Sequence, residues 1–461
     1  MTAPFAILLL AIAIMPLAAH EWWEHHYPKV SAILGATTLF YYLVILREIS
    51  RPLGSLHEYF SFICLIGSLF VVSGGIHIGV KGESTPLTNT LLLLIGAVLA
   101  NLIGTTGASM LLIRPYLRSN KYRLTEFHVV FFIFIVGNIG GALTPIGDPP
   151  LYLGYLKGVP FFWTLHSLSW MWLLGVGWLL GVFYLLDHRN FLRAPKEIRE
   201  QETAHETWSF GGWNNLFCLA MILGALFIQS PLFLREALMI LAAGLSWKTT
   251  AKTIHEQNQF TWAPIREVAI LFAGIFMTMM PALDWLEVHA SNLGVSTADA
   301  FFWGCGVLSS ILDNAPTYLS FLSASIGLFV DQDIINGVHH LLKNGAAGLT
   351  AAEANHTVEI NNTLAMLKRY HPESLVSGSI PLPHLQIAYL LGNHAAHLKA
   401  VSIGAVFFGA CTYIGNGPNF MIKSIADHAG AKTPSFPGYI FKYTLPILLP
   451  LFIMVWWLFF R

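Results

Sequence analysis

Long apolar stretches, separated by short polar ones, run along almost the whole chain. A helix needs about 20 mostly apolar residues to cross the hydrocarbon core of a bilayer. The pattern therefore predicts an all-α polytopic membrane protein that lies in the lipid bilayer. The stretches expected to cross it are Val30–Leu46, Tyr59–Val80, Phe127–Leu143, Phe161–Leu186, Asn215–Gln229, Leu232–Trp247, Val268–Leu283, Val401–Ile414 and Tyr439–Phe460.

The N-terminal stretch Met1–Ala19 is apolar as well. Its end, Pro16-Leu17-Ala18-Ala19, resembles the end of a secretory signal. However, no basic residue precedes the apolar part, as it does in such signals. We therefore expect that this stretch is retained as a first span.

Two further apolar segments, Leu87–Leu117 and Ala298–Val330, are too long for one simple span. Each has polar residues and glycine or proline near its middle, at Gly104-Thr105-Thr106-Gly107 and at Asp313-Asn314-Ala315-Pro316. Non-helical backbone at membrane depth is tolerated only inside protein or beside a water-filled cavity. Each segment is therefore expected to form a re-entrant hairpin of two half-length helices.

Basic residues indicate which loops stay in the cytoplasm, where Lys and Arg accumulate. They follow the first hairpin and several later spans, and they predict ten crossings plus two hairpins. In this arrangement the first hairpin opens inward and the second outward, and only Arg47 and Arg51 fall on the wrong side. We expect a multi-pass protein of a bacterial plasma (inner) membrane.

The polar stretch Asp331–Pro383 is expected to form a soluble insertion on the outer side. Within it, Thr350-Ala351-Ala352-Glu353 has the pattern of a capping box that starts a helix. Two interpretations remain open for its histidines: they bind a metal ion, or they belong to an ordinary solvated loop. These histidines are His339, His340, His356 and His371.

A short motif occurs twice, 268 residues apart, as Thr144-Pro145-Ile146-Gly147-Asp148-Pro149-Pro150 and as Thr412-Tyr413-Ile414-Gly415-Asn416-Gly417-Pro418. The hairpin breaks also align, with Asn314 on Thr105 at an offset of 209, and the insertion explains most of the difference between the offsets. Two copies of opposite orientation are the inverted-repeat design of secondary transporters. The alternative is that Gly and Pro merely kink ordinary spans.

The repeat predicts how the chain is divided. Each repeat would contain a span, a re-entrant hairpin and a discontinuous helix, and the transport site would lie where the interrupted helices meet. The units expected are N-terminal spans in 1–56, the first inverted repeat in 57–200, linking spans in 201–265, and the second inverted repeat in 266–461 with the insertion 331–383.

The two hairpins and two discontinuous helices give four interruptions, and each carries hydroxyl, amide or carboxyl groups. Such hard oxygen donors suit a small cation, and glycines let the backbone approach it closely. The candidate binding residues are Asn101, Thr105 and Thr106 at the first interruption; Asn138, Thr144, Gly147 and Asp148 at the second; Ser309, Asp313, Asn314 and Thr317 at the third; and Thr412, Gly415, Asn416 and Asn419 at the fourth. A sodium ion would be held by Thr105, Asp148, Ser309, Asp313, Asn314 and Asn416.

Asp148 and Asp313 are the sharpest functional candidates, because a carboxyl group at membrane depth is costly and commonly functional. Burial favours the protonated form of a carboxyl group, so each could exchange a proton for a cation. The alternative interpretation is that each Asp caps a helix at a break. A helix cap can also be a ligand, so the two interpretations are compatible.

The composition mainly excludes classes of protein and of binding site. Charged residues make up 11% of the 461 residues, whereas soluble domains carry about 25%. The formal net charge of zero excludes a basic surface for nucleic acid. The four cysteines are far apart in apolar runs and predict neither zinc nor disulfides. Since no nucleophile–base or metal constellation stands at one depth, we expect neither an enzyme nor a cofactor, only sodium and protons as transported or coupling ions.

From about Tyr59 to the C-terminus the sequence resembles the ion transporter superfamily, which includes sodium/dicarboxylate symporters, citrate transporters, arsenite permeases and NhaD-type sodium/proton antiporters. Gly137-Asn138-Ile139-Gly140-Gly141, followed by the first motif copy, is most similar to the antiporter and citrate transporter branches. The Ser-Asn-Thr hairpin signature of the dicarboxylate branch is incomplete, because only Asn314 and Thr106 match it. The resemblance implies a transport part that moves across the bilayer as a body, within a homodimer.

The interruptions contain two acids but no Lys or Arg, which bears on the substrate. Like charges a few ångströms apart cost on the order of 4 kcal/mol at an effective dielectric of 20, so a free dicarboxylate would be repelled. We therefore expect sodium/proton antiport by alternating access, with Asp148 and Asp313 alternating between a proton and the cation. The alternative is a carrier of citrate or another carboxylate coupled to sodium, protons or metal. A channel is disfavoured by hairpins that open to both sides.

Overall fold

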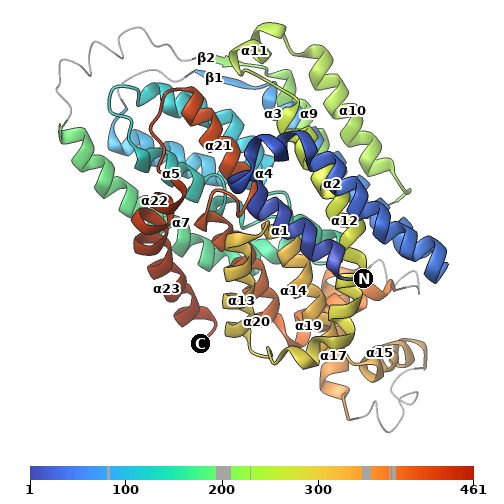
Figure 1. The fold of residues 1–461 in the computed structure, drawn as a ribbon. Helices are drawn as coiled ribbons and strands as arrows, with labels where there is room; N and C mark the ends of the chain where they lie inside the picture. The colour runs from blue at the N-terminus through green and yellow to red at the C-terminus, as the bar shows by residue number, and fades with distance from the viewer. Residues whose placement is uncertain (80–83, 194–208, 229, 345–354, 373–374, 376–379) are drawn as a thin grey trace.

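The computed structural model describes the chain except residues 80–83, 194–208, 229, 345–354, 373–374 and 376–379, and the described part is almost entirely helical (Figure 1). The helices up to residue 225 are α1 Ala3–Ala18, α2 His20–Phe40, η1 Tyr41–Leu46, α3 Ser50–Gly74, α4 Pro86–Ser119, α5 Glu126–Ile135, η2 Ile139–Gly141, α6 Pro149–Leu156, α7 Phe161–Arg193 and α9 Asn214–Ala225. Strands β1 His77–Gly79 and β2 Ser209–Gly211 pair antiparallel, with His77 opposite Gly211.

The second half of the chain is helical in the same way. Its helices are α10 Leu234–Thr249, α11 Lys252–Gln257, α12 Ala263–His289, η3 Ala290–Leu293, α13 Ala298–Ile311, α14 Asn314–Phe329, α15 Gln332–Asn344, α17 Thr357–Tyr370, α19 Leu382–Asn393, α20 Ala395–Phe408, η5 Gly409–Cys411, α21 Gly417–His428, α22 Phe436–Tyr439, η6 Ile440–Leu448 and α23 Leu449–Phe459. Every apolar stretch predicted to cross the bilayer overlaps at least one of these helices or one from the first half.

Several helices are long and apolar enough to cross a bilayer, so the chain is a multi-pass membrane protein. Within the described residues six helices qualify by length and composition, or up to eight if each of two bent pairs counts as one span. The six are His20–Leu46, Ser50–Gly74, Pro86–Ser119, Phe161–Arg193, Ala263–Asn292 and Phe436–Phe459. The ten predicted crossings stay a prediction, because α5, α9 and α13 are apolar but shorter than a full span.

The two predicted hairpin segments are interrupted where the sequence indicates. In α4, Gly104 has φ 77° and ψ 156°, a conformation that splits the helix and that residues with a side chain rarely adopt. α13 ends at Ile311 and α14 begins at Asn314, with Leu312 extended and Asp313 at the N-cap position between them. Both breaks release backbone groups from the helical hydrogen-bond pattern.

Two other helical segments are interrupted by irregular backbone in which glycines pack closely against carbonyl oxygens. Irregular backbone and the 3-10 turns η2 and η5 separate α5 from α6 and α20 from α21. A Cβ atom on Gly147 would lie 2.0 Å from the carbonyl oxygen of Gly141, and one on Gly415 would lie 2.7 Å from that of Gly409. The second pair follows the first at the motif offset of 268 residues, so the same contact occurs in both copies of the motif.

The helices before these interruptions form the centre of the molecule. α5 is completely buried from His128 to Ile135, and α20 is buried from Ala400 to Phe407. α13 and α14 pack on α20, while α4 packs on α7 and η2, so the interrupted backbone is surrounded by protein. The interior also holds four cysteines: Cys64, Cys218, Cys305 and Cys411 are all buried.

The polar insertion 331–383 is not a simple solvated loop in its described part. It forms α15 and α17, with Ile334, Val338 and Leu367 buried, and α17 packs against α19. The overall polarity of this stretch predicted a solvated segment, but its apolar side chains recur at helical spacing, so one face of each helix can be buried. The capping box expected at 350–353 lies outside the described residues. No three His, Cys, Asp or Glu side chains of the described chain are grouped so that they could hold a metal ion, so the metal interpretation of the histidines has no support there.

The two ends of the molecule carry different elements. The β1–β2 sheet and α11 lie at one end, whereas α15 and α17 lie at the opposite end (Figure 1). This agrees with a basic loop at Lys252 and the insertion lying on opposite sides. Arg51, predicted on the outer side against the charge rule, is paired: its Nη2 lies 2.5 Å from Oδ1 of Asp284, and Tyr42 donates to the other oxygen at 2.6 Å. Arg51 therefore has an acidic partner in this part of the molecule, and its placement on the outer side stays a prediction.

Candidate functional site

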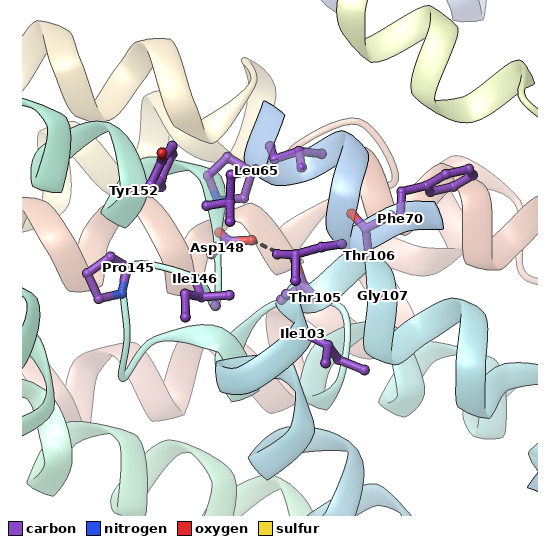
Figure 2. A pocket seen from close by; sticks show the side chains of 15 residues that line it. Leu65, Phe70, Ile103, Thr105, Thr106, Gly107, Pro145, Ile146, Asp148 and Tyr152 are labelled. Atoms are coloured by element: carbon purple, nitrogen blue, oxygen red, sulfur yellow. Dashed lines mark hydrogen bonds between the residues drawn. The ribbon is translucent and has the colours of Figure 1, made fainter. Parts of the chain in front are cut away.

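The four interruptions meet at the carboxyl group of Asp148, which directly precedes α6. Thr105 Oγ1 and Asn416 Nδ2 donate hydrogen bonds to Oδ1 of Asp148 at 3.0 and 2.9 Å. Asn314 Nδ2 donates to Oδ2 at 2.6 Å. The three donors come from the break of α4, the start of α21 and the start of α14, so each interruption contributes one side chain. Figure 2 shows Thr105 next to Asp148.

The carboxyl group of Asp148 is buried, and no opposite charge is found among its described hydrogen-bond donors. Asp148 is 1% exposed, and its described hydrogen-bond donors, all uncharged, are no more than 2% exposed. Uncharged donors stabilise a buried carboxylate only in part, because no opposite charge balances it. A proton or a cation on Asp148 would supply that balance. Oδ1 of Asn314 is also buried and has no hydrogen-bond partner within the described chain, so it is an oxygen available to such a cation.

Matching hydrogen bonds tie each motif copy to a hairpin break. Thr144 Oγ1 donates to the carbonyl oxygen of Asn101 at 2.6 Å, and Thr412 Oγ1 donates to that of Ser310 at 2.7 Å. The two threonines are related by the motif offset of 268 residues and their two acceptors by the hairpin offset of 209. Residues that align in the sequence therefore make the same contact in space.

Three asparagines connect the two copies of the motif beside Asp148. Asn138 Nδ2 donates to Oδ1 of Asn419 at 2.6 Å, and Asn416 Nδ2 lies 3.1 Å from Oδ1 of Asn138. Asn419 Nδ2 donates in turn to the carbonyl oxygens of Gly409 and Thr412, both at 2.8 Å. The amide of Asn416 is thus held between Asn138 and Asp148, which fixes its orientation.

Other predicted residues hold the backbone of the interruptions instead of the carboxyl group. Asn101 donates to two backbone carbonyl oxygens and accepts from the backbone amide of Leu143. Ser309 Oγ and Thr317 Oγ1 donate to backbone carbonyl oxygens at 2.6 and 2.9 Å. Gly147 contributes its carbonyl oxygen, which accepts from the amide of Thr105 at 2.8 Å. These residues give the interruptions their shape.

The two acids predicted to act together occupy different positions. Oδ1 of Asp313 accepts a hydrogen bond from the amide of Ala315 at 3.0 Å, which is the geometry of a helix cap. Within the described chain, the donors to Asp148 do not include Asp313. Asp313 therefore caps α14, which is compatible with a ligand role as well, whereas Asp148 accepts hydrogen bonds from the three other interruptions.

A small cavity of about 30 Å³ lies against Asp148 (Figure 2). Its polar side chains are those of Thr105, Thr106 and Asp148, and most of its other lining residues are apolar, among them Leu65 and Phe70 of α3. This volume is enough for one or two water molecules or a small ion. Thr106, which makes no hydrogen bond to the carboxyl group, thus lines the space next to it.

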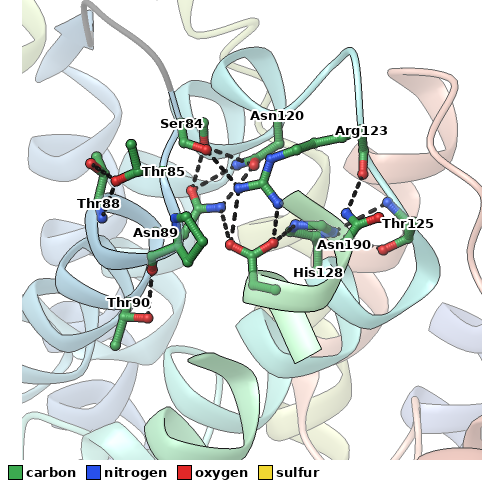
Figure 3. A network of polar contacts seen from close by, with 12 residues as sticks. Ser84, Thr85, Thr88, Asn89, Thr90, Asn120, Arg123, Thr125, His128 and Asn190 are labelled. Atoms are coloured by element: carbon green, nitrogen blue, oxygen red, sulfur yellow. Dashed lines mark hydrogen bonds and ion pairs between the residues drawn. The ribbon is translucent and has the colours of Figure 1, made fainter. Parts of the chain in front are cut away.

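A buried polar network near the end of α7 was missed in the sequence (Figure 3). Asp187, which is fully buried, accepts hydrogen bonds from both terminal nitrogens of Arg123 and from Asn89 Nδ2 at 2.9 Å, and it lies 3.0 Å from Nε2 of His128. Burial lowers the pKa of Arg123, but the hydrogen bond and charge of Asp187 raise it, and the net result is a raised pKa. Asp187, an acid within an apolar helix, was the signal in the sequence that could have indicated this network. Its partner Arg123 lies 64 residues earlier in the chain, so local sequence does not identify the pair.

A family model matches residues 1–460, nearly the whole chain, and the family is described as putative citrate transport. Among curated proteins, none matches the chain. The matched region includes Asp148 and all four interruptions, so the candidate site lies inside it.

Proposed function

Because the chain belongs to this citrate transport family, we propose that it is a secondary transporter that carries citrate, or a closely related carboxylate, together with a coupling cation or proton bound at Asp148. The observation that carries the proposal is the convergence of four interruptions on one buried carboxyl group. Interrupted helices that meet near the midplane are where secondary transporters bind their substrates and coupling ions.

An inverted repeat, with copies in 57–200 and 266–461, would provide the two alternating access states. Two observations support it. The hydroxyl groups of Thr144 and Thr412 make equivalent bonds to the two hairpin breaks. The glycine contacts at Gly147 and Gly415 are equivalent as well. We further propose, from the resemblance, that the protein works as a homodimer in a bacterial plasma membrane.

The charge of Asp148 explains why carboxylate transport would need a coupling ion. Citrate is itself anionic, and two like charges about 4 Å apart cost about 4 kcal/mol at an effective dielectric of 20. A proton or cation on Asp148 removes this repulsion, so occupation of the acid and binding of citrate favour each other. The oxygens nearest to such a cation would come from Asp148, Thr105 and Asn314, while Ser309, Asp313 and Asn416 complete the sodium ligand set expected from the sequence.

Sodium/proton antiport is a second candidate for the same residues. The specific observation in its favour is the unpartnered buried oxygen of Asn314 beside a carboxyl group that has only uncharged donors in the described chain. The family favours citrate as cargo, so antiport ranks second. Under either function Asp148 has the central role, and Asp313 caps α14.

Uptake of radiolabelled citrate into liposomes that contain the purified protein tests the proposal. An inward sodium gradient, an inward proton gradient and added magnesium are supplied separately. We expect uptake that depends on at least one of these three conditions. The uptake rate should fall at least about tenfold in Asp148→Asn, which corresponds to an increase of about 1.4 kcal/mol in the activation free energy.

Asp427→Asn is the matched control, because Asp427 is an acid on α21 that pairs with Lys423 at 2.5 Å, outside the site. Its uptake should equal that of the wild type. Absence of citrate uptake under every gradient would contradict the carboxylate proposal. If sodium then drives proton release, recorded with an internal pH dye, the second candidate replaces it.

A further inference from the structure

A second and larger cavity, of about 450 Å³, lies at the far end of α6 from Asp148. α6 has 8 residues, so about 12 Å of helix separates the two places at 1.5 Å per residue. The walls come from α3, α6, the start of α7, α10, α17 and the start of α19. α17 belongs to the insertion expected on the outer side, so this cavity would face outward. Its volume falls within the range of small-molecule sites.

The cavity is lined by side chains that carry or can acquire positive charge. These are His57, Arg235, Arg369, His371 and His384. The two acids among its described lining residues are already compensated. Glu58 Oε1 lies 2.6 Å from Lys157 Nζ. Glu236 Oε1 lies 2.7 Å from Arg235 Nη2 and accepts from Ser61 Oγ at 2.6 Å.

Arg369 is the charge that remains. In the described part of the chain no carboxylate pairs with it, and its guanidinium lies 5.1 Å from the ring centroid of Tyr370. His371 and His384 stack at the cavity wall with ring centroids 4.2 Å apart, and His371 Nε2 lies 3.2 Å from the carbonyl oxygen of Gly158. The stacked rings place two imidazoles at one wall of the cavity that Arg369 also lines.

This arrangement fits an anion better than a metal ion. The described residues contain no group of three His, Cys, Asp or Glu side chains that could hold a metal. A guanidinium instead binds carboxylates through two parallel hydrogen bonds, and positively charged clefts raise the local concentration of anions. An anion with several carboxylates could contact Arg369 and the imidazoles at the same time.

We propose that this cavity is a capture site for a polycarboxylate anion, distinct from the site at Asp148. The choice of citrate as its ligand rests on the proposed function. Citrate from the outer side would bind here first, at one end of α6, before it meets the coupling ion at the other end. Binding in this cavity would raise the local concentration of citrate near the transport site. It would not itself couple transport to an ion, because the coupling ion binds at Asp148.

Isothermal titration of the purified full-length protein with citrate at low salt tests this site directly. We expect Arg369→Gln to weaken citrate binding by about tenfold, in line with loss of a charge-assisted bidentate contact. Arg369→Lys, which keeps the charge, should lose less. Lys368→Gln is the matched control, because it removes the same charge from the adjacent position of α17, which does not line the cavity. Its affinity should equal that of the wild type, and acetate should bind far more weakly than citrate.

The titration is repeated in Asp148→Asn to separate the two sites. Binding that depends on Arg369 should persist there. Equal citrate affinity in Arg369→Gln and Lys368→Gln, or no citrate binding to the wild type, would overturn the capture site. Absence of citrate uptake in liposomes with Arg369-dependent binding intact would contradict the transport function and leave the capture site standing.

Discussion

Asn314 donates a 2.6 Å hydrogen bond to Asp148 across 166 residues of sequence. The residue aligned with Asn314 in the other hairpin, Thr105, donates to the second oxygen of the same carboxyl group. The position aligned with Asp148 is Asn416, and its amide is the third donor. The two halves of the chain therefore contribute aligned residues to this site, but only the first half has an acid at the motif position. Asp148 is the feature that makes the site asymmetric.

Asp148→Asn should stop coupled transport while the protein stays folded. An amide holds neither a proton nor a cation as a carboxylate does. The substitution also removes a buried charge, which relieves its desolvation, and the amide of Asn314 can turn to present its unpartnered oxygen. We expect a Tm in detergent within a few degrees of the wild type, measured by thermal unfolding. A large fall in Tm together with lost uptake would assign a structural role to Asp148.

Asn314→Ala should raise the sodium or proton concentration that gives half-maximal uptake. It removes a donor to Asp148 and the free oxygen proposed as a cation ligand. Hydrogen bonds to charged groups contribute about 1.5–3 kcal/mol, so a change of tenfold or more is expected. Asn362→Ala is the control, since Asn362 is an exposed amide of α17 bonded to Asn393 at 3.0 Å. Identical half-maximal concentrations in the two variants would count against the ligand role.

Gly147→Ala and Gly415→Ala should both destabilise the protein, and Gly147→Ala more strongly. Their Cβ atoms would lie 2.0 and 2.7 Å from backbone carbonyl oxygens, which cannot move as a flexible side chain can. Overpacking costs about 1–3 kcal/mol or more. Gly177→Ala and Gly181→Ala of α7 are the controls, because nothing lies within 4 Å of their Cβ positions, and they should gain up to about 1 kcal/mol of helix propensity. Thermal unfolding of the four variants should separate them into these two pairs.

Arg123→Met should destabilise the network at the end of α7. It leaves the fully buried Asp187 without its guanidinium, which costs about 3–5 kcal/mol for a buried ion pair broken on one side. Adding Asp187→Leu should recover most of the loss, because no buried charge then remains. Lys423→Met, which breaks the exposed pair with Asp427, should cost less than about 1 kcal/mol. Thermal unfolding in detergent gives all three values, and a double variant no more stable than Arg123→Met would contradict this view of the network.

Much of the site could be predicted from the sequence because its signals are local. Glycine at 104 and the polar residues around it stand out in an apolar run, and the recurrence of the motif shows which positions are equivalent. The different environments of Asp148 and Asp313 were less visible, although the alignment already paired the first with Asn416 and the second with Gly104. Pairings such as Arg123 with Asp187 depend on how helices pack, and nothing in the neighbouring sequence indicates them.

The hydrogen bonds to Asp148 also set an order on the assembly of the protein. Their donors lie 43, 166 and 268 residues from the acid, so Asn314 and Asn416 are synthesised well after Asp148. A carboxyl group without these partners is costly in lipid. While the ribosome is still making the second half, Asp148 must therefore stay protonated or in contact with water. The first half of the chain can reach its final packing only after the second half has been inserted beside it.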